Sequence, residues 1–200
     1  MAKSTLDDVV SLEFFGPFKL CGAKEKLLFD QEVAQFAGVY LWTVQFRDGF
    51  LINYVGETGT SFYRRMKDHM IQCMGGNYRI CDTEQLLEGR KTVLWNGMWR
   101  KGTRDLAPMF VDEKYVELAP RIRDYLRVLD ILVAPFETDR RTRRRIEGAI
   151  AFSLREQDDP TGSFISEDVR YFGKKQNETP LQVSIISSTK LLGLDHQLFA

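Results

Sequence analysis

The sequence predicts an α/β (α+β) fold in which a small, mainly antiparallel three-stranded sheet is flanked by helices. Two adjacent runs, GVYLWTVQF (38–46) and FLINYV (50–55), are rich in β-branched and aromatic residues and are separated by the turn RDG. A third apolar run, LRVLDILVA (126–134), indicates a buried strand. Residues 61–73 and 139–155 carry apolar side chains at helical spacing. We therefore expect a hairpin, a third strand and at least two covering helices.

The turn between the first two strands decides where two tyrosines point. A three-residue loop, with Gly49 in the left-handed conformation, pairs Trp42 with Tyr54 and sets Tyr40 diagonal to Tyr54 on the same face. A two-residue loop would place the tyrosines on opposite faces. Aromatic residues are favoured in strands generally, so the tyrosine pair alone identifies no functional site.

The two helices follow from periodicity and capping. In the first, the buried side has intervals of four, four and three, and is formed by Phe62, Met66, Met70 and Cys73. Thr60 or Ser61 is positioned to cap it. In the second helix, 139–155, one side carries Ile146, Ile150 and Leu154. Both patterns predict helices that cover the sheet with one face.

The remaining segments are less regular, and we expect a single domain over 1–200. Residues 75–112 are dotted with glycine and contain one possible short helix near 83–87, which indicates an insertion. Residues 1–35 carry no firm assignment, and 156–200 contain the strand-like QVSII and a polar tail. Both ends are interpreted as elaborations of the core.

Composition narrows the class of protein. Hydrophobic residues make up 44% of the chain, which is enough to form a core and argues against disorder. No run approaches the roughly 18 apolar residues needed to cross a bilayer, so we expect no membrane partner. The N-terminus, MAKSTLDDVV, carries no export signal. Three cysteines without CxxC spacing favour neither a disulfide framework nor a zinc site and fit a reducing, cytoplasmic location.

The formal net charge of zero gives no overall sign of a polyanionic partner, but positive charge is segregated. Residues 140–145, RRTRRR, contain five arginines. Residues 90–104 contain five basic residues and no acid, interleaved with Trp95 and Trp99. Charge runs also occur on solvated faces and tryptophans in cores, so these segments indicate a nucleic-acid surface only in combination with a site.

A loop and a helix face supply chemistry beside the hairpin. The loop GETGTS (56–61) enters the first helix, where free backbone N–H groups suit a phosphate. It lacks the Gly-Lys-Ser/Thr ending of a nucleotide-binding P-loop, which argues against a nucleotide triphosphatase. Arg65 and His69 stand four residues apart and project side by side. A guanidinium and an imidazole on one small surface suit a phosphodiester.

The order of these features resembles the GIY-YIG nuclease superfamily. Gly38-Val39-Tyr40 is followed by Tyr54-Val55-Gly56 and then by a helix with an arginine and a histidine four apart. That family includes intron-encoded homing endonucleases, some type II restriction endonucleases and the incision module of bacterial excision repair. The resemblance implies a GIY-YIG-like core over about 36–155, with 75–112 inserted in it.

The resemblance leaves choices at three positions. Counting from the second tyrosine selects Arg64, whereas the buried Phe62 three residues before and His69 four residues after select Arg65, which we prefer. The family's metal-binding glutamate matches Glu147, with Glu156 as the fallback. Asn177 is a candidate for the family's downstream asparagine, although it lies farther from Glu147 than is usual.

The resemblance also implies a reaction and a set of roles. Glu147 would hold one Mg²⁺ (or Mn²⁺), Tyr40 would activate the attacking water and Tyr54 would orient it. His69 would relay the proton and Arg65 would bind the phosphate. Candidates for contact with the nucleic-acid backbone are Gly56, Arg64, Arg140, Arg141, Arg144 and Asn177.

We therefore expect a divalent-metal-dependent DNA endonuclease, with a restriction-type enzyme as the preferred form and a homodimer as one way to cut both strands. A catalytically weak nucleic-acid-binding module on the same scaffold is the first alternative. A structural or interaction protein, in which the site residues are incidental, is the second.

Overall fold

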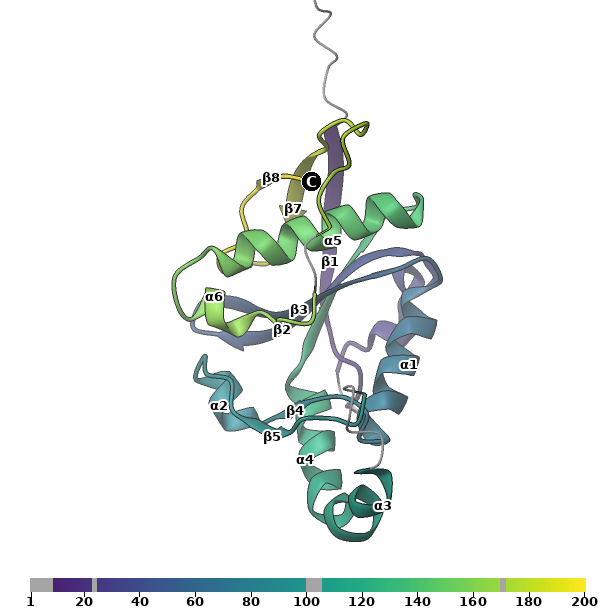
Figure 1. Ribbon diagram of the computed structural model, residues 1–200, viewed down its shortest axis with the longest axis vertical. Helices are drawn as coiled ribbons and strands as arrows, with labels where there is room; N and C mark the ends of the chain where they lie inside the picture. Colours follow the sequence, from purple (N-terminus) through teal and green to yellow (C-terminus); the bar gives the residue numbers. More distant parts are fainter. Residues whose placement is uncertain (1–8, 23–24, 100–105, 170–171) are drawn as a thin grey trace, which may run out of the picture.

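The computed structural model describes residues 9–22, 25–99, 106–169 and 172–200, and its centre is a six-stranded sheet (Figure 1). The strand order is β3-β2-β6-β1-β7-β8. The strands are β1 (Val9–Phe18), β2 (Gly38–Phe46), β3 (Gly49–Thr58), β6 (Asp130–Pro135), β7 (Gln182–Ser187) and β8 (Gln197–Phe199). β1 and β7 are parallel and the other neighbours are antiparallel, so the sheet is mixed. It is strongly curled into a half-barrel.

The predicted small three-stranded sheet is therefore wrong, although the fold is α+β. The three strands expected in the sheet are the neighbours β3-β2-β6, and β1, β7 and β8 continue the sheet beyond β6. The strand-like QVSII of the sequence is confirmed as β7. These three additional strands come from the terminal segments that we interpreted as elaborations. β1 lies inside the sheet, between β6 and β7, so the N-terminal segment is part of its centre.

The helices are α1 (Phe62–Met74), α2 (Thr83–Leu87), α3 (Ala107–Met109), α4 (Tyr115–Val128), α5 (Arg140–Arg155) and α6 (Thr161–Phe164). A π-helical turn, Phe110–Lys114, joins α3 to α4, and short 3₁₀ turns lie at Leu28–Asp30 and Glu32–Gln35. α4 continues through Pro120 and includes Leu126–Val128, which the sequence had assigned to the third strand. The other helices at 62–74, 83–87 and 140–155 match the predicted segments within a residue or two.

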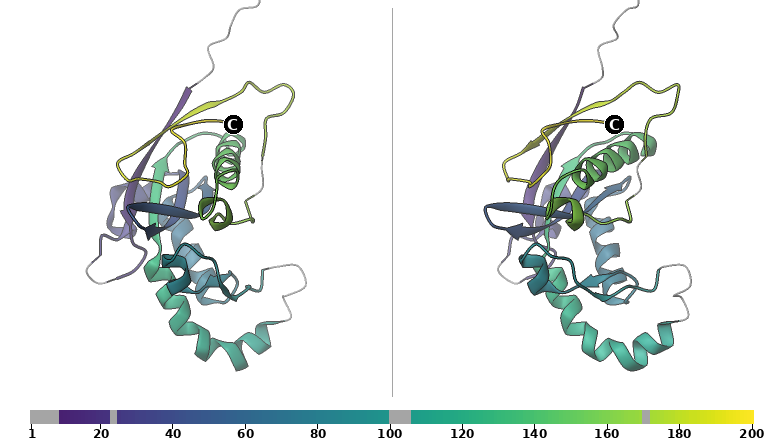
Figure 2. Two further views of the ribbon diagram at one scale, coloured as in Figure 1. Left: turned by 90° about the vertical axis from the view of Figure 1, so that its left-hand side faces the viewer. Right: turned by 60° about the vertical axis from the view of Figure 1, so that its left-hand side comes forward.

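Two apolar clusters, one on each face of the sheet, hold the layers together. Along β2, Tyr40, Trp42 and Val44 join the cluster that packs on α1 and α4, whereas Val39 and Leu41 join the cluster that packs on α5. This alternation is the period of two expected for a strand. Figures 1 and 2 show α5 lying along one side of the sheet and α1 and α4 on the other.

The segment 75–112, of which the structure describes 75–99 and 106–112, contributes side chains to the core. Its small sheet pairs β4 (Ile80–Cys81) with β5 (Val93–Trp95), and both lie between α4 and the β2–β3 hairpin (Figure 1). Ile80, Cys81, Leu86 and Phe110 are buried in the same cluster as Tyr40 and Trp42. Irregular spacing concealed these core positions, because short strands and single turns show no long period. Among the described residues, no helix is long and apolar enough to cross a membrane.

Candidate active site

The hairpin brings the two tyrosines together by a route different from the predicted one. The turn contains two residues, and Arg47 rather than Gly49 takes the left-handed conformation, with φ of 52°. Phe46 accordingly pairs with Gly49. An irregularity in the ladder between Trp42 and Thr43 then shifts the register by one residue, so that Trp42 still faces Tyr54. The predicted pairing of Trp42 with Tyr54 is confirmed, but a β-bulge produces it. The three-residue loop would also have paired Val44 with Ile52 and Phe46 with Phe50, whereas in the structure Val44 faces Leu51.

Tyr40 and Tyr54 lie on the same side of the hairpin. Their ring centroids are 6.2 Å apart. Tyr40 is fully buried, whereas Tyr54 is half-buried and lines a cavity. Burial, followed by the charge of nearby Glu147, raises the pKa of Tyr54 to about 12. Burial is also the main reason that the pKa of Tyr40 lies well above its usual value, so both phenols are neutral at neutral pH.

Gly56 pairs with Tyr40 across the hairpin and is buried against its ring. A Cβ at this position would lie 2.2 Å from Tyr40 Cζ and 2.3 Å from its Oη. The glycine of the Tyr54-Val55-Gly56 motif therefore makes room for the phenol. We had assigned Gly56 to phosphate binding, but its place in the structure is beneath Tyr40.

Gly56→Ala is expected to displace the Tyr40 ring and to lower the free energy of unfolding by about 1–3 kcal/mol, the usual cost of overpacking a core. The hydrogen bonds made by the phenol would be lost with it. Urea denaturation measures the change in stability. Wild-type stability in this variant would show that the close packing against Tyr40 is unimportant.

α1 carries the basic side chains to Tyr40. Ser61 caps the helix by accepting a hydrogen bond from the Arg64 backbone N–H at 3.2 Å. His69 Nε2 lies 2.7 Å from Tyr40 Oη, and Arg65 Nε donates to the same oxygen at 3.2 Å. Arg64 is exposed. The structure thus brings Arg65, and not Arg64, to the tyrosine.

The protonation of this group follows from burial. Burial, and secondarily the charge of Arg65, lowers the pKa of His69 to about 3, so the imidazole is neutral at neutral pH. Since the Tyr40 oxygen already accepts from Arg65, its O–H is available to donate to His69 Nε2. The buried Nδ1 of His69 has no hydrogen-bond partner among the described residues. His69 Nε2 is therefore placed to accept the hydrogen bond of the Tyr40 hydroxyl.

Acid should destabilise the protein through His69. The unfolded histidine takes up a proton near pH 6.5, whereas the folded one resists protonation until about pH 3. The unfolded state thus binds more protons in this window, and stability falls as the pH is lowered, by up to about 1.4 kcal/mol per pH unit. We expect His69→Gln to show a shallower loss of stability between pH 6.5 and pH 4. Parallel urea-unfolding curves for the two proteins would contradict this.

Glu147 lies on α5, opposite β3. Asp139 caps this helix by accepting from the Thr142 backbone N–H at 3.1 Å and from its hydroxyl at 2.6 Å. Burial, followed by the negative charge of Glu57, raises the pKa of Glu147 to about 7. The charges of Arg144 and Arg65 act in the opposite direction, which places both guanidinium groups near this carboxylate.

Glu57 is a neighbour that the sequence reasoning missed, although it stands next to Gly56 in the GETGTS loop. Its carboxylate pairs with Arg143 Nε at 2.9 Å, and Arg140 Nε lies 4.0 Å from it. Arg143 is buried, so one of the five arginines serves to neutralise Glu57. The sequence could have indicated this ion pair, because it contains an acidic residue in the GETGTS loop and an arginine-rich helix.

Glu147 offers one carboxylate that a hard cation could bind. Among the described residues, no three His, Cys, Asp or Glu side chains gather into a ready metal cage. Mg²⁺ commonly uses only one or two carboxylates and completes its shell with water and substrate phosphate. Because the negative charge of Glu147 is destabilised by burial and by Glu57, a cation there would stabilise it. Glu147 is the residue that would hold the ion, and the ion would neutralise phosphate charge.

The other candidates have varied positions. Arg141 is committed to Glu178, with nitrogen-to-oxygen distances of 2.7 and 2.8 Å, and Arg144 lies over the Phe172 ring. Arg140 is largely exposed, with 78% of its side-chain surface accessible. Asn177 is exposed in the loop beside Glu178. Arg140 is thus accessible to a ligand from solvent, Arg144 packs on an aromatic ring, and Arg141 anchors a loop.

Comparison with known proteins identifies no relative. No family model, curated protein or solved structure matches the chain. What the site can do therefore follows from its geometry: a neutral phenol–imidazole pair, a guanidinium bonded to the phenol, and a carboxylate with a raised pKa near the phenol and the guanidinium.

Proposed function

We propose that the protein is a divalent-metal-dependent endonuclease that hydrolyses phosphodiester bonds in DNA. The observation that supports this most is the hydrogen-bonded chain from Arg65 through Tyr40 to His69. The chain faces the charge of Glu147, which reaches it from a different helix. The phenol–imidazole pair suits proton removal, and the guanidinium suits phosphate binding.

Tyr40 and His69 together supply the base. Because its pKa is raised, Tyr40 is a neutral phenol at neutral pH and not a phenolate. Tyr40 can therefore accept a proton from water only if it gives up its own proton at the same time. Water gives a proton to Tyr40 Oη while the Tyr40 proton moves 2.7 Å to His69 Nε2. The water oxygen forms a bond to phosphorus, and the bond from phosphorus to the leaving sugar oxygen breaks. The leaving oxygen takes up a proton from solvent, and His69 later releases its extra proton to solvent, which restores the neutral pair. Half-buried Tyr54 orients the water from the adjacent side.

Arg65 couples substrate binding to exposure of the base. In this structure Tyr40 is fully buried and Arg65 covers its oxygen. An anionic phosphate is a stronger acceptor for a guanidinium than a neutral phenol. Substrate therefore draws Arg65 toward itself, which uncovers the phenol oxygen and places positive charge on the phosphate undergoing attack.

Incubation of supercoiled plasmid with the protein tests this proposal. We expect nicked or linear DNA with Mg²⁺ or Mn²⁺ and intact plasmid with EDTA. An electrophoretic mobility assay on the same DNA distinguishes the alternative of a catalytically weak binding module. Binding without cleavage under any divalent ion would favour that module and reject the nuclease.

A further inference from the structure

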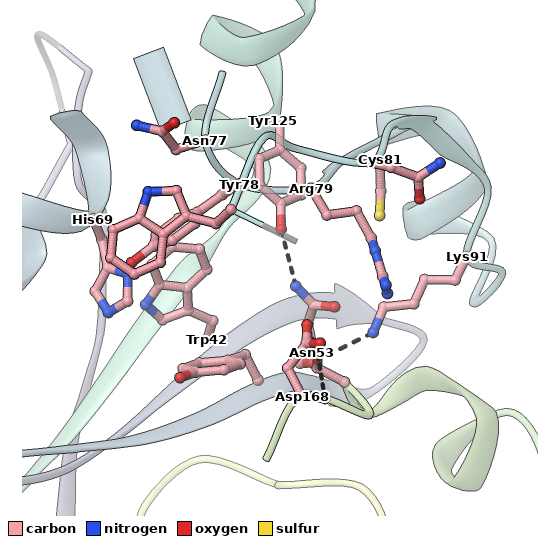
Figure 3. A pocket seen from close by; sticks show the side chains of 14 residues that line it. Trp42, Asn53, His69, Asn77, Tyr78, Arg79, Cys81, Lys91, Tyr125 and Asp168 are labelled. Atoms are coloured by element: carbon pink, nitrogen blue, oxygen red, sulfur yellow. Dashed lines mark hydrogen bonds between the residues drawn. The ribbon is translucent and has the colours of Figure 1, made fainter. Parts of the chain in front are cut away.

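A cavity of about 300 Å³ adjoins the active site, and the proposed reaction does not use it. It lies beside Tyr54 and His69, which line it, and is otherwise built mainly by residues of 77–99, from the segment around β4 and β5. Figure 3 shows aromatic side chains gathered at one end and charged and amide side chains at the other. The aromatic end suits an aromatic part of a ligand, and the polar end suits its hydrogen-bonding groups.

The aromatic end is built for a flat ring. His69 and Tyr78 have ring centroids 5.4 Å apart, and Tyr78 meets Trp99 edge to face at 6.0 Å. Trp99 is 64% exposed although it is among the largest apolar side chains of the protein. An exposed tryptophan at the rim of a cavity offers a face on which a base can stack.

The polar end contains two cationic side chains, and the nearby charges of Asp168 and Glu167 act on one of them, Lys91. Lys91 Nζ donates to the backbone oxygens of Asn53 and Phe164, and Arg79 Nε is buried without a hydrogen-bond partner. Neither side chain forms an ion pair within the described part of the chain. In Figure 3 both point toward the same space beside Asn53 and Asp168. Burial lowers the pKa of Lys91 to about 8, and the nearby charge of Arg79 contributes.

Asp168 supplies an acceptor at this end. Its carboxylate accepts a hydrogen bond from the Ser166 hydroxyl at 3.0 Å, and it lines the cavity with Asn53. Cationic donors and a carboxylate therefore converge opposite the aromatic wall. A ligand that fits these side chains would be a planar ring with hydrogen-bond acceptors on one edge, for the cations, and donors on the adjacent edge, for the carboxylate.

We propose that this cavity takes one guanine base, turned out of the DNA stack beside the bond to be cut. The O6 and N7 atoms of guanine are the acceptors that arginine and lysine recognise, which fits Arg79 and Lys91. Its N1–H and N2–H groups donate toward Asp168, and its faces stack at Tyr78 and Trp99. A base must leave the duplex to reach such a cavity. The inference rests on the proposed nuclease function, and it assigns sequence preference to the segment around β4 and β5.

Calorimetric titration with dGMP, dAMP, dCMP, dTMP and inorganic phosphate, each in EDTA, tests the assignment on the full chain. We expect dGMP to bind most tightly and phosphate to give no comparable signal. Trp99→Ala should weaken dGMP binding about tenfold, and Arg79→Ala should weaken it similarly and remove the preference for guanine. Phe199→Ala, a similarly exposed aromatic on β8, and Arg123→Ala, an exposed arginine on α4, should bind as wild type does.

The inference is overturned if the four nucleotides bind equally, if phosphate alone binds as well as dGMP, or if Trp99→Ala and Arg79→Ala bind dGMP like wild type. Its failure is distinguishable from failure of the nuclease proposal, because binding in EDTA requires no cleavage. A protein that cuts plasmid but does not bind dGMP rejects the cavity assignment alone. A protein that binds dGMP with the expected dependence on Trp99 and Arg79 but never cuts supports the cavity and rejects the nuclease.

Discussion

Glu147→Gln is expected to abolish metal-dependent cleavage, with a loss of about a thousandfold or more. The substitution keeps the size of the side chain and removes the negative charge that would hold the cation. The folded protein should tolerate it well, because burial and Glu57 already disfavour that charge. At pH 8, where wild-type Glu147 is ionised at a cost, the free energy of unfolding should rise by on the order of 1 kcal/mol.

Glu156→Gln is the matched control on the same helix. Glu156 is exposed at the C-terminal end of α5, nine residues beyond Glu147, so we expect cleavage at the wild-type rate. Plasmid cleavage rates at saturating Mg²⁺ measure both variants, and urea unfolding shows that each is folded. An active Glu147→Gln enzyme, or an inactive Glu156→Gln enzyme, would place the metal elsewhere.

Tyr40→Phe should have the second largest effect. It keeps the ring and removes the oxygen that passes a proton to His69, so cleavage should fall by about 10²–10⁴-fold. The buried His69 Nε2 would lose its partner, which should cost about 1–3 kcal/mol of stability. Single-turnover cleavage, with enzyme in excess over plasmid, isolates the chemical step.

Tyr63→Phe separates this role from a general loss of a tyrosine hydroxyl. Tyr63 is 40% exposed on α1 and packs edge to face on Phe29, away from the hydrogen bonds of Tyr40. It should cleave like wild type. If Tyr40→Phe retained full activity, the relay to His69 would be excluded, and the base would have to lie elsewhere in the site.

The elements that local periodicity determines were predictable. The intervals of Phe62, Met66, Met70 and Cys73 predicted α1; Met70 is half-buried, and the other three side chains are fully buried. α5 follows in the same way from the side that carries Ile146 and Ile150. The apolar residues of a helix recur on one face within a few turns, so a short stretch of sequence is enough to predict which face is buried.

Register within the hairpin was predictable only in part. Alternation of side chains indicated that Tyr40 and Tyr54 share a face, and the ring distance of 6.2 Å agrees. The predicted three-residue loop was wrong, because a two-residue turn and a bulge beyond Trp42 give the same pairing. The shorter turn and the bulge shift the register in opposite directions, so the alternation of apolar residues in the sequence does not reveal either of them.

The extended sheet and the cavity depend on distant contacts. Val9 pairs with Gln182 and Phe14 with Ser187, so β1 and β7 meet across most of the chain. Nothing near residue 9 indicates that partner. The charged end of the cavity likewise joins Arg79 and Lys91 to Asp168 through tertiary packing. Such groupings become visible only after the strands have been placed.

The most direct test compares plasmid cleavage by wild type, Arg65→Ala and Lys67→Ala in Mg²⁺ and in EDTA. Arg65 donates to Tyr40, whereas Lys67 is exposed on the same helix. We expect wild type and Lys67→Ala to cut in Mg²⁺ only, and Arg65→Ala to lose about a hundredfold or more. Cleavage by Arg65→Ala at the rate of Lys67→Ala, or an inert wild type in both Mg²⁺ and Mn²⁺, would contradict the assignment of Tyr40, Arg65, His69 and Glu147 as a nuclease active site.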